Sequence, residues 1–190
     1  MSGLCGVVHF DGAPVDPQIL SHMATAASHR GPDGTRFWTD DAVGFAHLVH
    51  HVTPESCCEQ QPLVSEDGRF ALNADARIDN REELSRTLKA KGYLTEPNPT
   101  DADLILAAYR CWDTDCPSHL IGDFAFAIWG PDHRIGHFWP PRAIAEVLER
   151  LVALVFKCFR PEESAYRVAD AMIEARFGTG YSSVSSLPGM

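Results

Sequence analysis

Short apolar segments bounded by turn residues recur along the first 130 residues of the chain. Such segments are typical of buried strands, and we expect strands at residues 4–10, 36–39, 43–49, 69–75 and 124–129. The turns between them are clear in the sequence. Asp11-Gly12 closes the first strand, Asp40-Asp41 separates the second from the third, and Asp67-Gly68 predicts a hairpin before the fourth.

Three other segments repeat their apolar residues with a helical period, namely residues 17–28, 81–92 and 101–112. Asn80 is placed to cap the second helix, and Gly92 to end it. The third helix would bury Leu104, Ile105 and Ala108 on one face. Strands and helices follow one another irregularly, so the order predicts an α+β fold rather than a regular βαβ alternation.

The pattern changes after residue 138. Residues 141–159 and 161–178 predict two helices, the second with Pro and acidic residues in its first turn, as the helix dipole favours. We therefore expect a main domain at residues 1–138 and a helical C-terminal extension at residues 139–190. The apolar stripe at residues 148–159 is short for a membrane span and carries charges, so a core face or a homodimer face is expected.

The overall charge narrows the classes of function. At pH 7 the 190 residues carry a formal net charge of −10, which disfavours nucleic acid and anionic membrane as partners. No basic region leads into an apolar run at the N-terminus, so we expect a cytoplasmic protein without a signal peptide. The six cysteines form no CxxC pair, and we expect free thiols and no metal site.

Ser2 is the first candidate for chemistry. A methionine before a small residue is normally removed, which would make Ser2 the first residue of the mature chain. An N-terminal Ser, Thr or Cys can act as a nucleophile with its own α-amine as the base, because that amine titrates near neutral pH. Serine is common at this position, so the pattern alone carries little weight.

Ser2 also opens a series of motifs that resembles one family. Residues 2–7, Ser-Gly-Leu-Cys-Gly-Val, resemble the Cys-Gly-Ile-x-Gly-Val opening of asparagine synthetases. Residues 29–34 match that family's His-Arg-Gly-Pro-Asp-Gly loop in full. Residues 120–129 are close to its Leu-x-Gly-x-Phe-Ala-Phe-Ala-Ile-Trp strand, and Gln61-Pro62 and residues 100–106 match further motifs in the same order.

The resemblance implies the glutaminase half of these enzymes, a class II (type 2) glutamine amidotransferase domain. Its fold would be an Ntn-hydrolase-like αββα sandwich of antiparallel sheets, here incomplete and followed by the helical segment. In this family the domain hydrolyses glutamine, and the ammonia reaches an ATP-dependent ligase domain that completes asparagine biosynthesis. That domain's Ser-Gly-Gly-x-Asp-Ser loop is not in this sequence. We therefore expect no cofactor in this chain, and ATP and Mg²⁺ only with a partner domain or protein.

Two positions that the family uses for hydrolysis and substrate binding are altered. Ser2 replaces the nucleophilic cysteine, and an alkoxide is much harder to form near neutral pH than a thiolate. His47, before Leu48, falls where an Arg-Leu pair binds the substrate carboxylate. A neutral imidazole cannot make the two-pronged contact of a guanidinium.

The remaining site positions lie further along the chain. Asp75 and Ala76 fall where an Asn-Gly pair forms the oxyanion hole, although a register two residues earlier would place Asn73 there. A carboxylate would repel the developing oxyanion that an amide N–H stabilises. Asp101 matches the family's aspartate that contacts the substrate amine, and a helix N-terminal role would explain it equally well.

Three functions remain open at this point. The chain is a degenerate glutaminase-type domain, an active N-terminal-Ser amidohydrolase, or a scaffold that docks a separate ATP-dependent amide synthetase, as lasso-peptide cyclase-like proteins do. Preserved scaffold motifs beside altered site residues favour the first. A truncated or frameshifted gene and a stand-alone protein are equally compatible with the sequence.

Overall fold

The computed structural model describes residues 2–9, 11–51, 57, 59–130 and 137–139. All of these belong to the first of two units into which the chain divides, residues 1–142. The helices expected at 141–159 and 161–178 lie outside the described residues. The predicted boundary between residues 138 and 139 therefore stays a prediction.

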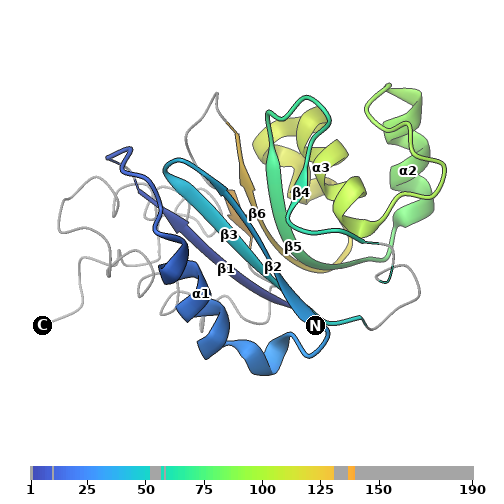
Figure 1. Ribbon diagram of the computed structural model, residues 1–190. Coiled ribbons are helices and arrows are strands. Elements are labelled where there is room, and N and C mark those ends of the chain that lie inside the picture. Colours follow the sequence, from blue (N-terminus) through green and yellow to red (C-terminus); the bar gives the residue numbers. More distant parts are fainter. Residues whose placement is uncertain (1, 10, 52–56, 58, 131–136, 140–190) are drawn as a thin grey trace, which may run out of the picture. The chain divides into compact units, whose positions relative to one another are not determined.

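The first sheet consists of three antiparallel strands in the order β1-β3-β2: β1 (Gly3–Val8), β3 (Val43–Val49) and β2 (Gly34–Asp40). The central strand β3 is buried along its whole length. Helix α1 (Pro17–Ala26) begins at the N-cap Asp16 and buries Leu20 and Ala24 against this sheet (Figure 1). Between α1 and β2 lies the short 3₁₀ helix η1 (Ser28–Arg30).

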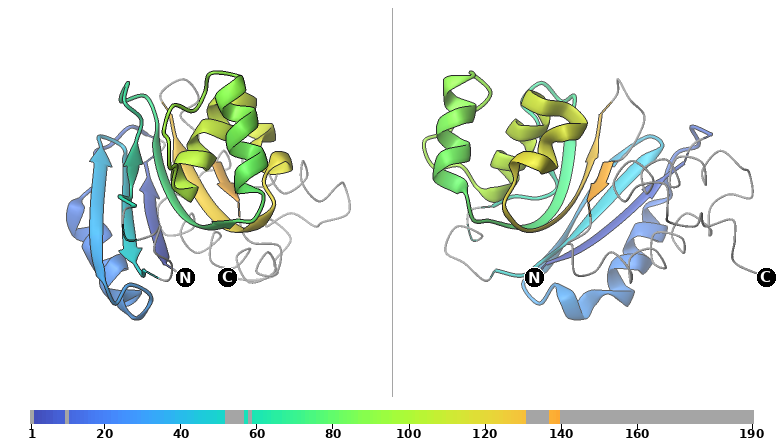
Figure 2. Two further views of the ribbon diagram at one scale, coloured as in Figure 1. Left: turned by 90° about the vertical axis from the view of Figure 1, so that its right-hand side faces the viewer. Right: turned by 180° about the vertical axis from the view of Figure 1, so that it is seen from behind.

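The second sheet has four antiparallel strands in the order β4-β5-β6-β7: β4 (Leu63–Val64), β5 (Ala71–Ile78), β6 (Gly122–Trp129) and β7 (His137–Trp139). Helices α2 (Arg81–Ala90) and α3 (Asp101–Trp112) cover one face of it, as both views in Figure 2 show. The 3₁₀ helix η3 (Asp113–His119) leads from α3 towards β6. Leu72, Ala74 and Phe126 from the strands pack with Leu104 and Ile105 of α3 in the largest core cluster.

The two sheets pack face to face. Val43 and Phe45 of β3 form a second cluster with Ala71 of β5. Asn73 of β5 donates hydrogen bonds from Nδ2 to the carbonyl oxygens of Cys5 (3.3 Å) and Ala46 (3.1 Å) in the opposite sheet. With α1 on one outer face and α2 and α3 on the other, the layers are α, β, β and α. The predicted α+β sandwich of antiparallel sheets is confirmed.

All five expected strands and all three expected helices of the main domain are present. The fourth strand runs on to Ile78, three residues further than predicted, and β4, β7, η1 and η3 were not expected. The tight turn between β2 and β3 contains Asp41 and Ala42 rather than Asp40 and Asp41. Asp41 adopts a positive φ of 42° there.

Asn80 occupies the N-cap position of α2, as predicted, but its side chain does not do the capping. Its side chain makes no hydrogen bond to the helix. Instead Nδ2 donates to the carbonyl of His119 (3.0 Å), and Oδ1 accepts from the N–H of Ile121 (3.0 Å). The side chain therefore joins the start of α2 to the segment that enters β6. Gly92 does follow the end of α2 with the positive φ (79°) expected of a glycine at that position.

Within the described residues, no helix is long and apolar enough to cross a membrane. The same residues hold no group of three or more His, Cys, Asp or Glu side chains that could bind a metal ion. His47, His50 and His51 thus form no such group in the described part of the chain. The described cysteines, Cys5, Cys57, Cys111 and Cys116, are free thiols.

Candidate functional site

Ser2 lies where the two sheets meet. Its backbone nitrogen donates a hydrogen bond to Oδ1 of Asp75 on β5, at 2.9 Å. Its hydroxyl oxygen accepts a hydrogen bond from the N–H of His50, just after β3, at 3.3 Å. Ser2 is half-buried. The backbone nitrogen and the hydroxyl oxygen of Ser2 therefore both have hydrogen-bond partners, one on β5 and one just after β3.

The strand register explains how Ser2 reaches this place. Gly3 is paired with Leu48, so the residue before β1 meets the residues that follow β3. Gly31, in the His-Arg-Gly-Pro-Asp-Gly loop, also lies against Leu48. A Cβ at Gly31 would come within 2.6 Å of Leu48 Cβ, so only glycine fits. The long loop motif thus shapes the backbone beside Ser2.

Asp75 and Asn73 project from the same face of β5, because side chains two residues apart in a strand point the same way. Asn73 is fully buried and bonded to the backbone of the first sheet, as described above. Asp75 lies one step further along and contacts Ser2. Of the two residues that sequence reasoning considered for the oxyanion position, the structure brings Asp75 to the nucleophile position.

His47 is buried between the sheets, with 6% of its surface exposed. Its Nδ1 lies 2.9 Å from Oδ1 of Asn73. Asn73 donates to two carbonyl groups from Nδ2, so its Oδ1 must be the acceptor and the Nδ1 of His47 the donor. Burial lowers the pKa of His47, while the bond to Asn73 and the charge of Asp75 oppose this. The ring is a neutral bridge between sheets.

The backbone N–H of Ala76 lies on the β4 side of β5, beyond the residues of β5 that pair with β4. The backbone N–H and C=O groups of odd-numbered residues in this strand point towards β6, as the hydrogen bond from the N–H of Asp79 to Ile121 shows. Those of even-numbered residues point towards β4, where Leu72 pairs with Leu63. N–H groups of alternate residues point to the same edge of a strand. The N–H of Ala76 therefore points away from β6, one residue beyond Asp75. This is the kind of backbone donor that an oxyanion hole uses.

Asp101 is the first residue of α3, and Thr100 before it forms the helix cap with Asp103. The carboxylate of Asp101 is ion-paired with Arg81 of α2. Arg81 also donates from Nη2 to the carbonyl of Pro99, at 2.6 Å. The negative charge that the family resemblance assigns to the substrate amine is thus matched by an arginine of this chain.

Two residues beside this helix start were not predicted as site residues. Glu59 accepts from the N–H of Ala102 (3.2 Å) and from Nε2 of Gln61 (2.9 Å). Burial raises the pKa of Glu59 to about 7, with the charges of Asp101 and Asp103 adding to the rise and hydrogen bonds opposing it. Gln61 was noted only as part of a Gln-Pro motif. The partner of the Gln61 side chain is Ala74 on β5, 13 residues away, and no local pattern in the sequence indicates this contact.

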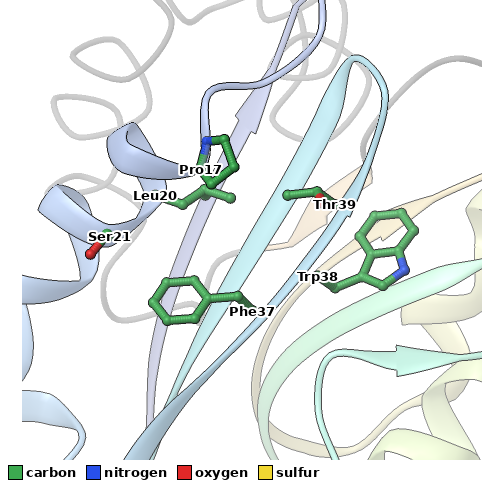
Figure 3. A pocket seen from close by; sticks show the side chains of 6 residues that line it. All are labelled: Pro17, Leu20, Ser21, Phe37, Trp38 and Thr39. Carbon is green, nitrogen blue, oxygen red and sulfur yellow. The ribbon is translucent and has the colours of Figure 1, made fainter.

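A shallow apolar pocket of about 310 Å³ lies elsewhere, between α1 and β2. Figure 3 shows its lining residues, which are Pro17, Leu20, Ser21, Phe37, Trp38 and Thr39. Thr39 pairs with Gly44 near the start of β3, whereas Ser2 lies beside the end of that strand. The pocket is therefore separate from the Ser2 site.

The fold is of the Ntn-hydrolase type. It is similar in structure to the glutamine phosphoribosylpyrophosphate amidotransferase of B. subtilis, with a TM-score of 0.53 and 17% identity over 68% of this chain and 35% of that one. A family model described as a glutamine amidotransferase domain matches residues 1–137. The chain belongs to this glutamine amidotransferase family, and the resemblance read from its motifs is confirmed.

The curated relatives narrow the type of domain. Asparagine synthetase (glutamine-hydrolyzing) 3 of Bacillus subtilis (strain 168) is 30% identical over 131 residues, which are 68% of this chain and 21% of that protein. A probable asparagine synthetase (glutamine-hydrolyzing) of Schizosaccharomyces pombe is 31% identical over 143 residues, 68% of this chain and 23% of that protein. The domain is thus of the asparagine synthetase type. The chain spans about a fifth of the length of these relatives.

Proposed function

We propose that this glutamine amidotransferase domain hydrolyses glutamine poorly and serves to dock a separate ATP-dependent amide synthetase. The observation that carries the proposal is the hydrogen bond from the Ser2 nitrogen to the Asp75 carboxylate. The proposal includes the division into residues 1–138 and 139–190 and a cytoplasmic location. Glutamine is the ligand that the family suggests for the site, and ATP and Mg²⁺ would enter only with the partner.

The Asp75 contact opposes general-base catalysis by the N-terminal amine. In an N-terminal nucleophile the α-amine must accept the proton of the hydroxyl. With Met1 removed, the nitrogen of Ser2 would be an amine 2.9 Å from a carboxylate oxygen. An adjacent opposite charge favours the protonated form. An ammonium group has no lone pair to accept a proton, so the base is disabled.

The rest of the site lacks the charges that glutamine hydrolysis needs. At Asp75 a negative group stands where the resemblance expects a donor, and losing one oxyanion donor lowers the rate by about 10²–10³. His47 is buried and bonded to Asn73, so it offers no charge to the substrate carboxylate. Asp101, which would meet the substrate amine, is ion-paired with Arg81. Binding and catalysis are weakened together.

One observation favours a second candidate, an active N-terminal-Ser amidohydrolase. The N–H of His50 donates to Oγ of Ser2, and such a bond stabilises a developing alkoxide. Two more distant relatives are named amidases: amidase chry2 of Gibberella zeae and amidase chyE of Penicillium rubens, at 27% and 22% identity. This candidate requires an amine base that Asp75 does not hold protonated.

Ammonia release from glutamine by the purified chain tests the proposal. We expect a rate that does not differ between the native chain and the Ser2→Ala variant. Intact-mass measurement must accompany the assay, because a retained Met1 excludes the amine-base route by itself. A rate that Ser2→Ala abolishes would contradict the proposal and support the amidohydrolase. Failure to co-purify with any ATP-dependent synthetase would count against the docking role.

A further inference from the structure

The pairing of β4 with β5 stops one step before the site. Leu63 pairs with Leu72, so continuing the antiparallel register places Gln61 opposite Ala74 and Glu59 opposite Ala76. The backbone leaves this register at Gln61, and its side chain takes over the pairing. Oε1 accepts from the N–H of Ala74 (2.5 Å), and Nε2 donates to the carbonyl of Ala74 (2.8 Å). A side-chain amide thus replaces one peptide unit of a neighbouring strand.

We propose that Gln61, oriented by Glu59, is a positioning residue of this site: it fixes the β5 edge at Ala74 and leaves the N–H of Ala76 open to a carbonyl ligand beside Asp75. The ligand class is an amide or carboxyl oxygen, such as the side-chain amide of glutamine. In that respect the inference rests on the proposed function, while the positioning of the edge does not.

The orientation of the Gln61 amide is fixed by its partners. Nε2 has two acceptors, a carboxylate oxygen of Glu59 (2.9 Å) and the carbonyl of Ala74, while Oε1 has one donor. A flipped amide would turn its oxygen towards both acceptors and its NH₂ group towards the N–H of Ala74, which is unfavourable. Gln61 is 5% exposed, so water does not readily replace these bonds. The side chain holds β5 in one position.

Glu59 connects this edge to two other elements. Its carboxylate accepts the N–H of Ala102 at the start of α3, and its carbonyl accepts from Nη1 of Arg36 on β2, at 3.2 Å. Because Glu59 turns towards α3, it does not pair with Ala76. Among the residues that the structure describes, the N–H of Ala76 has no hydrogen-bond partner on this edge.

Amide hydrogen exchange in the full chain tests the positioning directly. Gln61→Leu removes the polar atoms at similar size, and Gln60→Leu makes the same change at an exposed neighbour. We expect Ala74 to exchange about tenfold faster or more in Gln61→Leu, with Leu72 changed by less than about twofold. Gln60→Leu should change neither. Equal exchange of Ala74 in the native chain and Gln61→Leu would overturn the proposal.

The pH dependence of the Ala76 amide resonance tests the role of Glu59. Groups that face Glu59 include Asp101 and Asp103 of α3, with Arg81 paired to Asp101, and Arg36 bonded to its carbonyl. We expect the resonance to show a titration step near pH 7 in the native chain and to lose that step in Glu59→Gln, which keeps the acceptor oxygen. This comparison decides the matter even if Gln61→Leu does not fold. A flat native profile would overturn the role of Glu59.

The functional arm uses a chain with Ser2→Cys and Asp75→Asn, which should regain ammonia release from glutamine. Adding Gln61→Leu should lower kcat about tenfold or more with KM changed less than about threefold, because the Ala76 donor acts on the oxyanion. A double variant without activity would contradict the assignment of the lost hydrolysis to Ser2 and Asp75, and the exchange result still decides the positioning. An active double variant that Gln61→Leu leaves unchanged would overturn the link to catalysis.

Discussion

The site has two regions that differ in what they keep. Around Ser2 the groups are side chains, and each departs from the family pattern: a hydroxyl, a carboxylate at Asp75 and a buried His47. Along the β5 edge the key groups are the backbone of Ala74 and Ala76, held by Gln61 and Glu59. A backbone N–H survives a change of side chain, so the donor at Ala76 persists even though Gly is replaced by Ala. The side chains of the site thus depart from the family pattern, while its backbone framework is retained.

The largest expected effect tests whether the Ser2 region alone is responsible. Ser2→Cys with Asp75→Asn restores a thiol nucleophile and an amide donor and removes the carboxylate from the amine. We expect ammonia release from glutamine to exceed that of Ser2→Cys alone by about 10²-fold. Ser2→Cys with Asp123→Asn is the matched control, because Asp123 is exposed and pairs with Arg77. Equal rates in the two double variants would show that Asp75 is not the block.

The next effect concerns the buried link between the sheets. Asn73→Ala removes the bonds to His47, Cys5 and Ala46 and leaves buried polar groups unpaired. We expect the free energy of unfolding to fall by about 3 kcal/mol, measured by urea denaturation. Asn98→Ala, at an exposed loop position, should change it by less than about 0.5 kcal/mol. An unchanged free energy of unfolding in Asn73→Ala would mean that the Asn73 side chain does not hold His47 in place.

Glu59 should make stability depend on pH in a defined direction. Its pKa is raised from 4.5 to about 7, so the folded chain binds more protons than the unfolded chain between these values. The contribution of this group to stability therefore falls as the pH rises through that window. At pH 8, Glu59→Gln should be more stable than the native chain by about 2 kcal/mol. Denaturation curves at pH 5 and pH 8 check this, and a larger gain at pH 5 would contradict it.

The smallest expected effect concerns the start of α3, which contacts the β5 edge through Glu59. Thr100 and Asp103 form a capping box that fixes the start of α3, where Ala102 donates to Glu59. Thr100→Ala should lower the free energy of unfolding, measured by urea denaturation, by about 1 kcal/mol. Thr95→Ala, in the exposed loop before it, is the matched control. A Thr100→Ala change no larger than that of Thr95→Ala would mean that the cap does not fix the helix start.

Much of the fold could be predicted because its signals are local. The apolar run of residues 43–49 and the helical repeat of Leu104, Ile105 and Ala108 each specify one element and one buried face. The two-residue strand β4 had no such signal, because its pairing is set by β5. The N-cap position of Asn80 was predictable, but its side-chain partners were not, because they lie about 40 residues away near Ile121.

The site was harder to predict from the sequence, because its contacts also join residues far apart in the chain. Ser2 and Asp75 were each noted as altered positions, yet their contact joins residues 73 apart in sequence. Whether Asn73 or Asp75 faced the nucleophile was open, because both point the same way from one strand. Gln61 acts through a backbone group that no motif names. Contacts between sheets depend on strand register, which residue types alone do not specify.

In the proposed function, Asp75 holds the nitrogen of Ser2 as a hydrogen-bond donor and so prevents it from acting as a base. The direct measurement is the pKa of the Ser2 α-amine in the chain without Met1, followed by NMR titration or by pH-dependent amine labelling, in the native chain and in Asp75→Asn. We predict a native pKa above the ordinary value of about 8 and a lower pKa in Asp75→Asn. An amine pKa at or below about 8 that Asp75→Asn leaves unchanged would contradict it.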